Sequence, residues 1–167
     1  MTYIKRNGGG IPDFWSIIST FDECSFMKLI GATALCLVLV IGNVLLGYYC
    51  APLEILLTPL VVIGTMWLLL AAGPYASPWL TSLLSAVLIC GHDAGVKLYG
   101  GGTHDSAGQG FIHAFLFFGL IPAYLLLLAR LDQRPNLPAS ARLVANLLFP
   151  LLVGGYLSMF GWLGVEM

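Results

Sequence analysis

The chain has very little charge: of its 167 residues, only 9% are Asp, Glu, Lys or Arg. A soluble domain of this length carries roughly 25% charged residues, which keep its surface hydrated. Hydrophobic residues make up 59% of the chain, and the mean hydropathy is +0.92. The composition excludes an ordinary soluble domain and indicates an integral membrane protein.

An excess of positive charge is also missing. Seven Lys and Arg stand against eight Asp and Glu, which gives a formal net charge of −1. Proteins that bind nucleic acid gather Lys and Arg on one face, where these residues neutralise phosphates. We expect no such face here, so nucleic acid is excluded as a partner.

Cysteine pairs of the C-x-x-C type are absent, although the chain has four cysteines. Their absence excludes the common zinc-thiolate and thiol-redox motifs. Cys36 falls inside an apolar run, where a cysteine usually behaves as a small buried hydrophobe. Cys50 and Cys90 fall toward the same predicted membrane surface, so the geometry allows a disulfide between them.

Long apolar runs, by contrast, are abundant. A helix needs about 20 apolar residues to cross the roughly 30 Å hydrocarbon layer, where it satisfies its own backbone hydrogen bonds. The separators between the runs carry the Pro, Gly, Asn and Ser residues at which helices stop. We therefore expect an all-α polytopic membrane protein with about five transmembrane helices. The predicted spans are Leu29–Tyr49, Leu53–Ala72, Pro78–Val96, Ala107–Ala129 and Leu143–Leu163.

The chain divides into a short N-terminal segment, residues 1–28, and a transmembrane bundle, residues 29–167. Within the N-terminal segment, apolar residues at helical spacing predict an amphipathic helix that lies in the membrane surface. A helix that docks on a partner protein would show the same stripe. The stripe consists of Ile11, Phe14, Trp15, Ile18 and Phe21.

The basic residues predict how the chain crosses the membrane, because Lys and Arg are enriched in cytoplasmic loops. With the N-terminus in the cytoplasm, every basic residue except Lys97 falls on the cytoplasmic side. We therefore expect a protein of the cell's inner or plasma membrane, with a cytoplasmic N-terminus and an external C-terminus. The cytoplasmic set is Lys5, Arg6, Lys28, Arg130, Arg134 and Arg142.

All three histidines lie in the stretch "CGHDAGVKLYGGGTHDSAGQGFIH", which surrounds a predicted glycine-rich loop at residues 98–110. Ionisable groups at membrane depth are costly and usually functional. The stretch therefore predicts a polar cluster at the outer surface of the membrane. Its members are His92, Asp93, His104, Asp105 and His113.

The first and last histidines of this stretch, His92 and His113, are expected to meet across an antiparallel hairpin of the third and fourth spans. If the third helix ends near Leu98 and the fourth begins at Ala107, His92 and His113 each lie about 9 Å from a helix end. Their rings would then be level with each other, on neighbouring helices.

Further residues near this hairpin support a polar cluster. Gly91 and Gly95 have the small-xxx-small spacing that lets membrane helices approach closely. Asp93 and Lys97 are one helical turn apart, a spacing that permits an ion pair. Glu54, at the start of the second span, falls at the same membrane surface.

Imidazole and carboxylate groups together permit two chemistries. They ligate zinc and other divalent metals, and a catalytic metal site leaves one position open for water. The predicted metal ligands are His92, His104, Asp105 and His113, with a divalent metal such as zinc as the cofactor. Without metal, His92, Asp93 and His113 would act as catalytic acid–base groups.

Other interpretations of the cluster stay open, because its spacing matches no established ligand motif. The same residues can form a hydrogen-bonded network that holds the helices together, or part of a proton or ion pathway. The chain can also be a non-enzymatic subunit of a larger membrane complex, with other membrane proteins as partners besides the lipid bilayer. Whether the protein is an enzyme is not decided by its sequence.

Overall fold

The computed structural model describes residues 23–72, 77–99, 106–161 and 163, and these form five helices with no strand among them. Each helix is long and apolar enough to cross a membrane. The expected all-α polytopic membrane fold is therefore confirmed. The helices are α2 (Glu23–Tyr49), α3 (Ala51–Ala71), α4 (Pro78–Tyr99), α5 (Ser106–Asp132) and α6 (Ala139–Phe160).

The helix bounds differ from the predicted spans mainly near the glycine-rich loop and at α6. Residues 98–99 belong to α4 and residues 106–110 to α5, so the predicted loop is shorter than expected. Helix α6 ends at Phe160, before the predicted Leu163. The predicted amphipathic helix, His104 and Asp105 lie outside the described residues.

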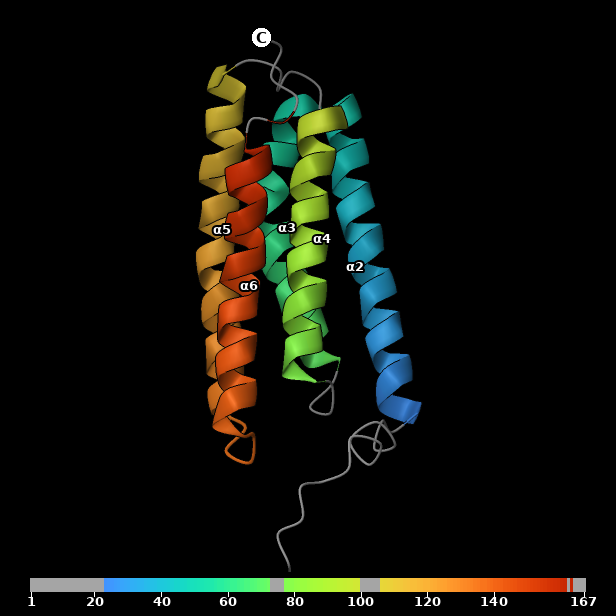
Figure 1. The fold of residues 1–167 in the computed structure, drawn as a ribbon. Coiled ribbons are helices and arrows are strands. Elements are labelled where there is room, and N and C mark those ends of the chain that lie inside the picture. Colours follow the sequence, from blue (N-terminus) through green and yellow to red (C-terminus); the bar gives the residue numbers. More distant parts are fainter. Residues whose placement is uncertain (1–22, 73–76, 100–105, 162, 164–167) are drawn as a thin grey trace, which may run out of the picture.

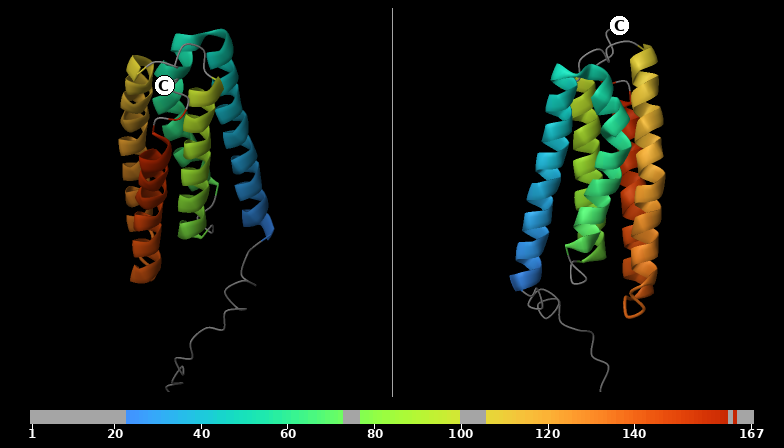
Figure 2. Two further views of the ribbon diagram at one scale, coloured as in Figure 1. Left: turned by 45° about the horizontal axis from the view of Figure 1, so that its top comes forward. Right: turned by 180° about the vertical axis from the view of Figure 1, so that it is seen from behind.

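The helices run alternately up and down, with α4 in contact with each of the other four (Figures 1 and 2). Helix α4 packs mainly against α6 and α2, whereas α5 packs mainly against α3. The expected hairpin of α4 and α5 is antiparallel, but these two helices touch only lightly. The sequence neighbours of α4 are therefore not its principal packing partners.

Small side chains explain why α4 can take this central place. Its buried face includes Ser82, Ser85 and Ala86, which let other helices approach closely. The Ser82 hydroxyl donates a hydrogen bond to the carbonyl of Ala145 on α6, at 3.0 Å. Larger side chains, among them Met66 of α3, fill the surrounding core.

Glycines mark two close helix contacts. A Cβ atom at Gly119 of α5 would lie 2.9 Å from the Cα of Pro59 on α3, closer than side chains normally pack. A Cβ at Gly95 of α4 would lie 2.7 Å from Val44 of α2, whereas one at Gly91 would meet nothing within 4 Å. The predicted small-residue pair thus serves the α2–α4 contact through Gly95 alone.

The two ends of the bundle carry different charges. Three basic residues lie at the end of the bundle that is lowest in Figure 1. They are Lys28 near the start of α2, Arg130 near the end of α5 and Arg142 near the start of α6. Lys97 lies near the opposite end and is fully buried. It is therefore an interior charge of the bundle rather than a charge on its surface.

Candidate functional site

Seven polar side chains lie where α2, α4 and α6 end and where α3 and α5 begin, and all of them except the half-buried His113 are buried. They form two groups that meet at α4. We name the first the charged group, which consists of Asp93, Lys97 and His113. We name the second the amide group, which consists of Asn43, Glu54, Thr58 and His92.

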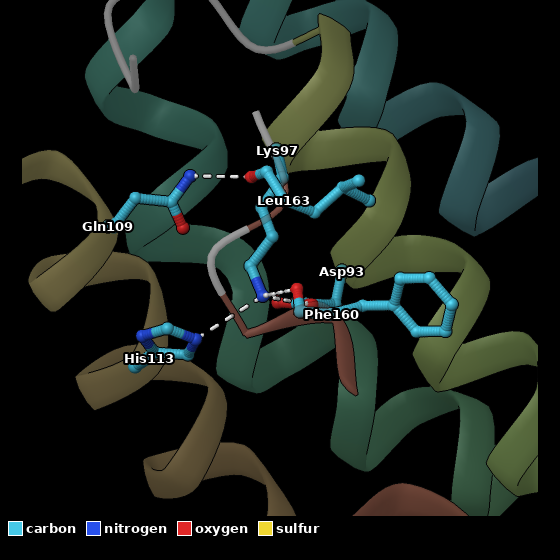
Figure 3. Close-up of polar contacts among 6 residues, drawn as sticks. All are labelled: Asp93, Lys97, Gln109, His113, Phe160 and Leu163. Carbon is cyan, nitrogen blue, oxygen red and sulfur yellow. Dashed lines mark hydrogen bonds and ion pairs between the residues drawn. The ribbon is translucent and has the colours of Figure 1, made fainter. Parts of the chain in front are cut away.

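The charged group is centred on the Lys97 ammonium. Its Nζ lies 2.6 Å from Asp93 Oδ2, and both side chains are buried. The ion pair expected from their spacing is therefore confirmed. The same Nζ lies 3.3 Å from Nε2 of His113 on α5, as Figure 3 shows.

The end of α6 also contributes to the charged group. Lys97 Nζ lies 3.5 Å from the carbonyl oxygen of Phe160, the last residue of this helix (Figure 3). Carbonyls at a helix C-terminus lack intrahelical partners and carry partial negative charge, which attracts a cation. The ammonium also lies 5.8 Å from the centre of the Tyr156 ring, within the range of a cation–π contact.

The contact with Lys97 fixes the proton position on the His113 ring. An ammonium can only donate hydrogen bonds, so Nε2 of His113 accepts. A neutral imidazole that accepts at Nε2 carries its proton at Nδ1. The Nδ1–H of His113 is therefore the remaining donor of the ring, and the backbone of Gly161 is a further hydrogen-bond partner of this imidazole.

Gln109 ties the start of α5 to the chain that follows α6. Its Nε2 donates to the carbonyl of Leu163 at 3.0 Å (Figure 3). A Cβ at Gly161 would lie 3.8 Å from His113 Nε2, so this stretch also passes close to the imidazole. The end of α6 thus covers the charged group from one side.

The amide group joins α2, α3 and α4 through Asn43. Its Nδ2 donates to the carbonyl of Glu54 at 3.2 Å and lies 2.9 Å from Nε2 of His92. The Thr58 hydroxyl donates to the same Glu54 carbonyl at 3.0 Å. Because the amide nitrogen donates, His92 accepts at Nε2 and carries its proton at Nδ1.

Glu54 is the unusual member of the amide group. Its side chain is fully buried, and neither carboxylate oxygen has a hydrogen-bond partner among the described residues. A Cβ built at Gly47 of α2 would overlap Glu54 Oε2. Only a glycine at position 47 leaves room for the carboxylate.

The predicted site residues are divided between the two groups. His92 and His113 each lie about 10 Å from an end of their own helix. However, the Nε2 of His92 contacts Asn43, whereas that of His113 contacts Lys97. The two imidazoles thus have different hydrogen-bond partners, and the groups connect through the consecutive residues His92 and Asp93.

The metal interpretation depends partly on residues outside the described ranges. Among the described residues, no three His, Cys, Asp or Glu side chains form a group that could hold a metal ion. His104 and Asp105 lie beyond these ranges, so the predicted ligand set stays a prediction. Cys50 and Cys90, for which a disulfide was considered, are both free thiols.

Several contributors were not found by sequence reasoning. Gly47 makes room for a side chain on another helix, and no local pattern indicates this. The Phe160 and Leu163 carbonyls belong to the backbone, so no residue type marks them. Tyr156 was open to prediction, because an aromatic ring near a helix end is a common partner of a buried cation.

The described residues define an integral membrane protein with five helices long and apolar enough to cross a membrane, and with buried titratable side chains at one end of the bundle. Comparison of the chain with known protein families, curated proteins and solved structures gave no significant match.

Proposed function

We propose that this protein forms part of a proton pathway, in which the charged group takes up and releases protons at one end of the bundle. The observation that supports this most is the position of Lys97, fully buried between Asp93 at 2.6 Å and His113 at 3.3 Å. Ionisable groups enclosed in a membrane bundle in contact with one another are typical of proton relays.

The chemistry of a transfer step follows from the contacts. A proton that binds His113 creates an imidazolium beside the Lys97 ammonium, and the two cations repel each other. Lys97 can then pass a proton to Asp93, which leaves a neutral amine and a neutral carboxylic acid. When Asp93 releases that proton, Lys97 can accept the proton of His113, and the starting state is restored.

The amide group supplies a second set of titratable groups beside the first. His92 follows directly before Asp93 on α4, and its Nε2 contacts Asn43, which in turn bonds the backbone of Glu54. Among the described residues, neither the Glu54 carboxylate nor the Nδ1 of His92 has a hydrogen-bond partner. We propose that these groups are the next acceptors of a proton that leaves Asp93.

The test is proton flux in proteoliposomes that contain the purified protein and an internal pH-sensitive dye. An imposed potassium diffusion potential should drive protons through the protein but not through empty liposomes. Asp93→Asn should abolish the flux, while Asp132→Asn, the same change at an exposed site near the other end, should leave it intact. Equal flux in both variants would refute the proposal.

The proposal includes an orientation, with the N-terminus in the cytoplasm and the charged group near the outer surface. The basic residues at the opposite end of the bundle support it. Cys50 is exposed at the turn between α2 and α3. A membrane-impermeant maleimide should therefore label it in intact cells, and Cys50→Ser should remove that label. Labelling only after the cells are opened would reverse the orientation.

A second candidate is a non-enzymatic subunit of a membrane complex. Helix α6 buries only Ala145, Phe149 and Val153, which leaves much of its apolar surface uncovered within the chain. Purification in mild detergent followed by mass spectrometry should then recover a stoichiometric membrane partner. The same sample, analysed for metals, tests the predicted ligands His92, His104, Asp105 and His113 through the presence or absence of stoichiometric zinc.

A further inference from the structure

The amide group contains a buried negative charge that the described residues do not balance. The Glu54 side chain is fully buried, and neither carboxylate oxygen has a hydrogen-bond partner in the described part of the chain. The fully buried Lys97 is already paired with Asp93. A buried carboxylate without a counter-charge is costly, because a medium of low dielectric constant disfavours the charged form.

The two helix ends beside this carboxylate do not balance its charge. Glu54 lies in the first turn of α3, where the helix dipole contributes about half a positive elementary charge. Its Oε2 lies against Gly47 in the last turn of α2, where the dipole contributes about half a negative charge. These two contributions cancel, so the full negative charge of the carboxylate remains.

Further oxygen atoms lie beside the carboxylate. Asn43 and Gly47 are one helical turn apart on α2, so their Cβ positions are about 5–6 Å from each other on one face. The Glu54 carboxylate occupies the Gly47 position of that face, and Asn43 Oδ1 is buried without a hydrogen-bond partner among the described residues. The Gly47 carbonyl, in the last turn of α2, lacks an intrahelical partner. A cation with ligands at about 2.4 Å bridges oxygen atoms up to about 5 Å apart, which suits this spacing.

The types of ligand favour a monovalent cation. One carboxylate balances one positive charge, whereas Ca²⁺ is usually held by several carboxylates. The other oxygen atoms are neutral carbonyls, and carbonyls at helix C-terminal ends hold Na⁺ in membrane transporters. K⁺ is held by rings of backbone carbonyls in channel filters, which supply more oxygen atoms than the amide group does. A sodium site with one charged ligand does not require a group of three His, Cys, Asp or Glu side chains, which the described residues do not form.

We propose that the amide group binds one sodium ion, held by the Glu54 carboxylate, Asn43 Oδ1 and the Gly47 carbonyl. The inference goes beyond the proposed function, because it names an ion other than the proton. A proton that reaches Glu54 would neutralise the carboxylate and release the sodium ion, and this consequence alone rests on the proposed function.

The site is tested by binding, without a proton gradient, so its failure is distinguishable from failure of the proposed function. Sodium binding without proton flux would support the site and refute the pathway. Proton flux through a protein that binds no sodium would support the pathway and refute the site.

The probe is radioactive sodium, added to the purified protein in detergent and sodium-free choline buffer. The unmodified protein should bind it saturably, with one ion per chain. Glu54→Gln keeps the shape of the side chain but removes its charge, so it should bind at least tenfold less. Asp132→Asn removes a negative charge at an exposed position and should bind like the unmodified protein. If the unmodified protein binds no sodium, or if Glu54→Gln binds as much, the proposal is wrong.

Two glycines of α2 provide a matched pair of variants for the position of the site. Gly47→Ala places a methyl group where Glu54 Oε2 lies, whereas a methyl group at Gly42 meets nothing within 4 Å. Gly47→Ala should therefore reduce sodium binding at least fivefold, and Gly42→Ala should not. Size exclusion and helical content show whether each variant folds, and Glu54→Gln decides the question if Gly47→Ala does not. Equal binding by the two folded variants would show that the ion is not held beside Gly47 and would overturn the proposal.

Competition tests the kind of ion. Unlabelled sodium chloride should displace the probe at a concentration at least fivefold lower than potassium chloride or calcium chloride. If either of these salts competes as well as sodium chloride on the unmodified protein, the site does not select sodium and the proposal is wrong.

Discussion

The two polar groups at the same end of the bundle differ in how their charge is balanced. In the charged group, Asp93 and Lys97 form an ion pair on one helix, and His113 and the end of α6 complete the contacts of the ammonium. In the amide group, Glu54 is equally buried, but its carboxylate has no hydrogen-bond partner in the part of the chain that the structure describes. The stability of the fold should therefore be sensitive to loss of a partner in the charged group. In the amide group, it should be sensitive to loss of the space around the Glu54 carboxylate.

The largest effect is expected when the paired charge loses one partner. Lys97→Met leaves Asp93 buried and uncompensated, which should lower the free energy of unfolding by about 3–5 kcal/mol. Denaturant titration in detergent micelles, followed by circular dichroism, measures the change. The double variant Asp93→Asn/Lys97→Met should lose much less, because no lone charge remains. Equal losses in both variants would show that the ion pair is not the cause.

The next effect concerns the space around the unpaired carboxylate. Gly47→Ala places a methyl group where Glu54 Oε2 lies, so the side chain must move. We expect the free energy of unfolding to fall by about 1–3 kcal/mol, the usual cost of overpacking. Gly42→Ala, on the same helix, meets nothing within 4 Å and should lose nothing. The same titration compares the two variants.

A second substitution distinguishes the overlap with Glu54 from other effects of the alanine at position 47. Adding Glu54→Ala to Gly47→Ala removes the atoms that overlap, so most of the lost stability should return. If the double variant is no more stable than Gly47→Ala alone, the contact between α2 and Glu54 does not limit the packing at position 47.

The smallest effect is expected when the unpaired carboxylate is neutralised. Glu54→Gln removes no ion pair and keeps the shape of the side chain, so the free energy of unfolding should change by less than about 1 kcal/mol. Asp93→Asn, the same chemical change in the charged group, removes the partner of Lys97 and should cost about 3 kcal/mol. If Glu54→Gln is as costly as Asp93→Asn, Glu54 has a partner in the folded state.

The five long helices of the described residues could be predicted because each is a separate apolar run in the sequence. The Asp93–Lys97 pair was also predictable, since it depends only on a spacing of four residues within one helix. Both features are local in the chain. No knowledge of how the helices pack is needed to find them.

The composition of the site could not be predicted in the same way. Polar and small residues lie on several sides of α4, so the sequence did not indicate that His92 faces α2 while Lys97 faces α5 and α6. The short connection between α4 and α5 suggested a close hairpin, but the packing partners of α4 are mainly α6 and α2. Glu54 was expected near the outer membrane surface, but its burial depends on contacts with other helices, which the sequence does not indicate.

The most direct test of the proton pathway compares two lysines in the proteoliposome flux assay. Asp93→Asn/Lys97→Gln removes both buried charges without leaving one alone, so the protein should fold and insert while flux falls to the level of empty liposomes. Lys28→Gln, at an exposed position near the other end, should conduct like the unmodified protein. Full flux through a folded Asp93→Asn/Lys97→Gln variant would contradict the proposed role of the charged group.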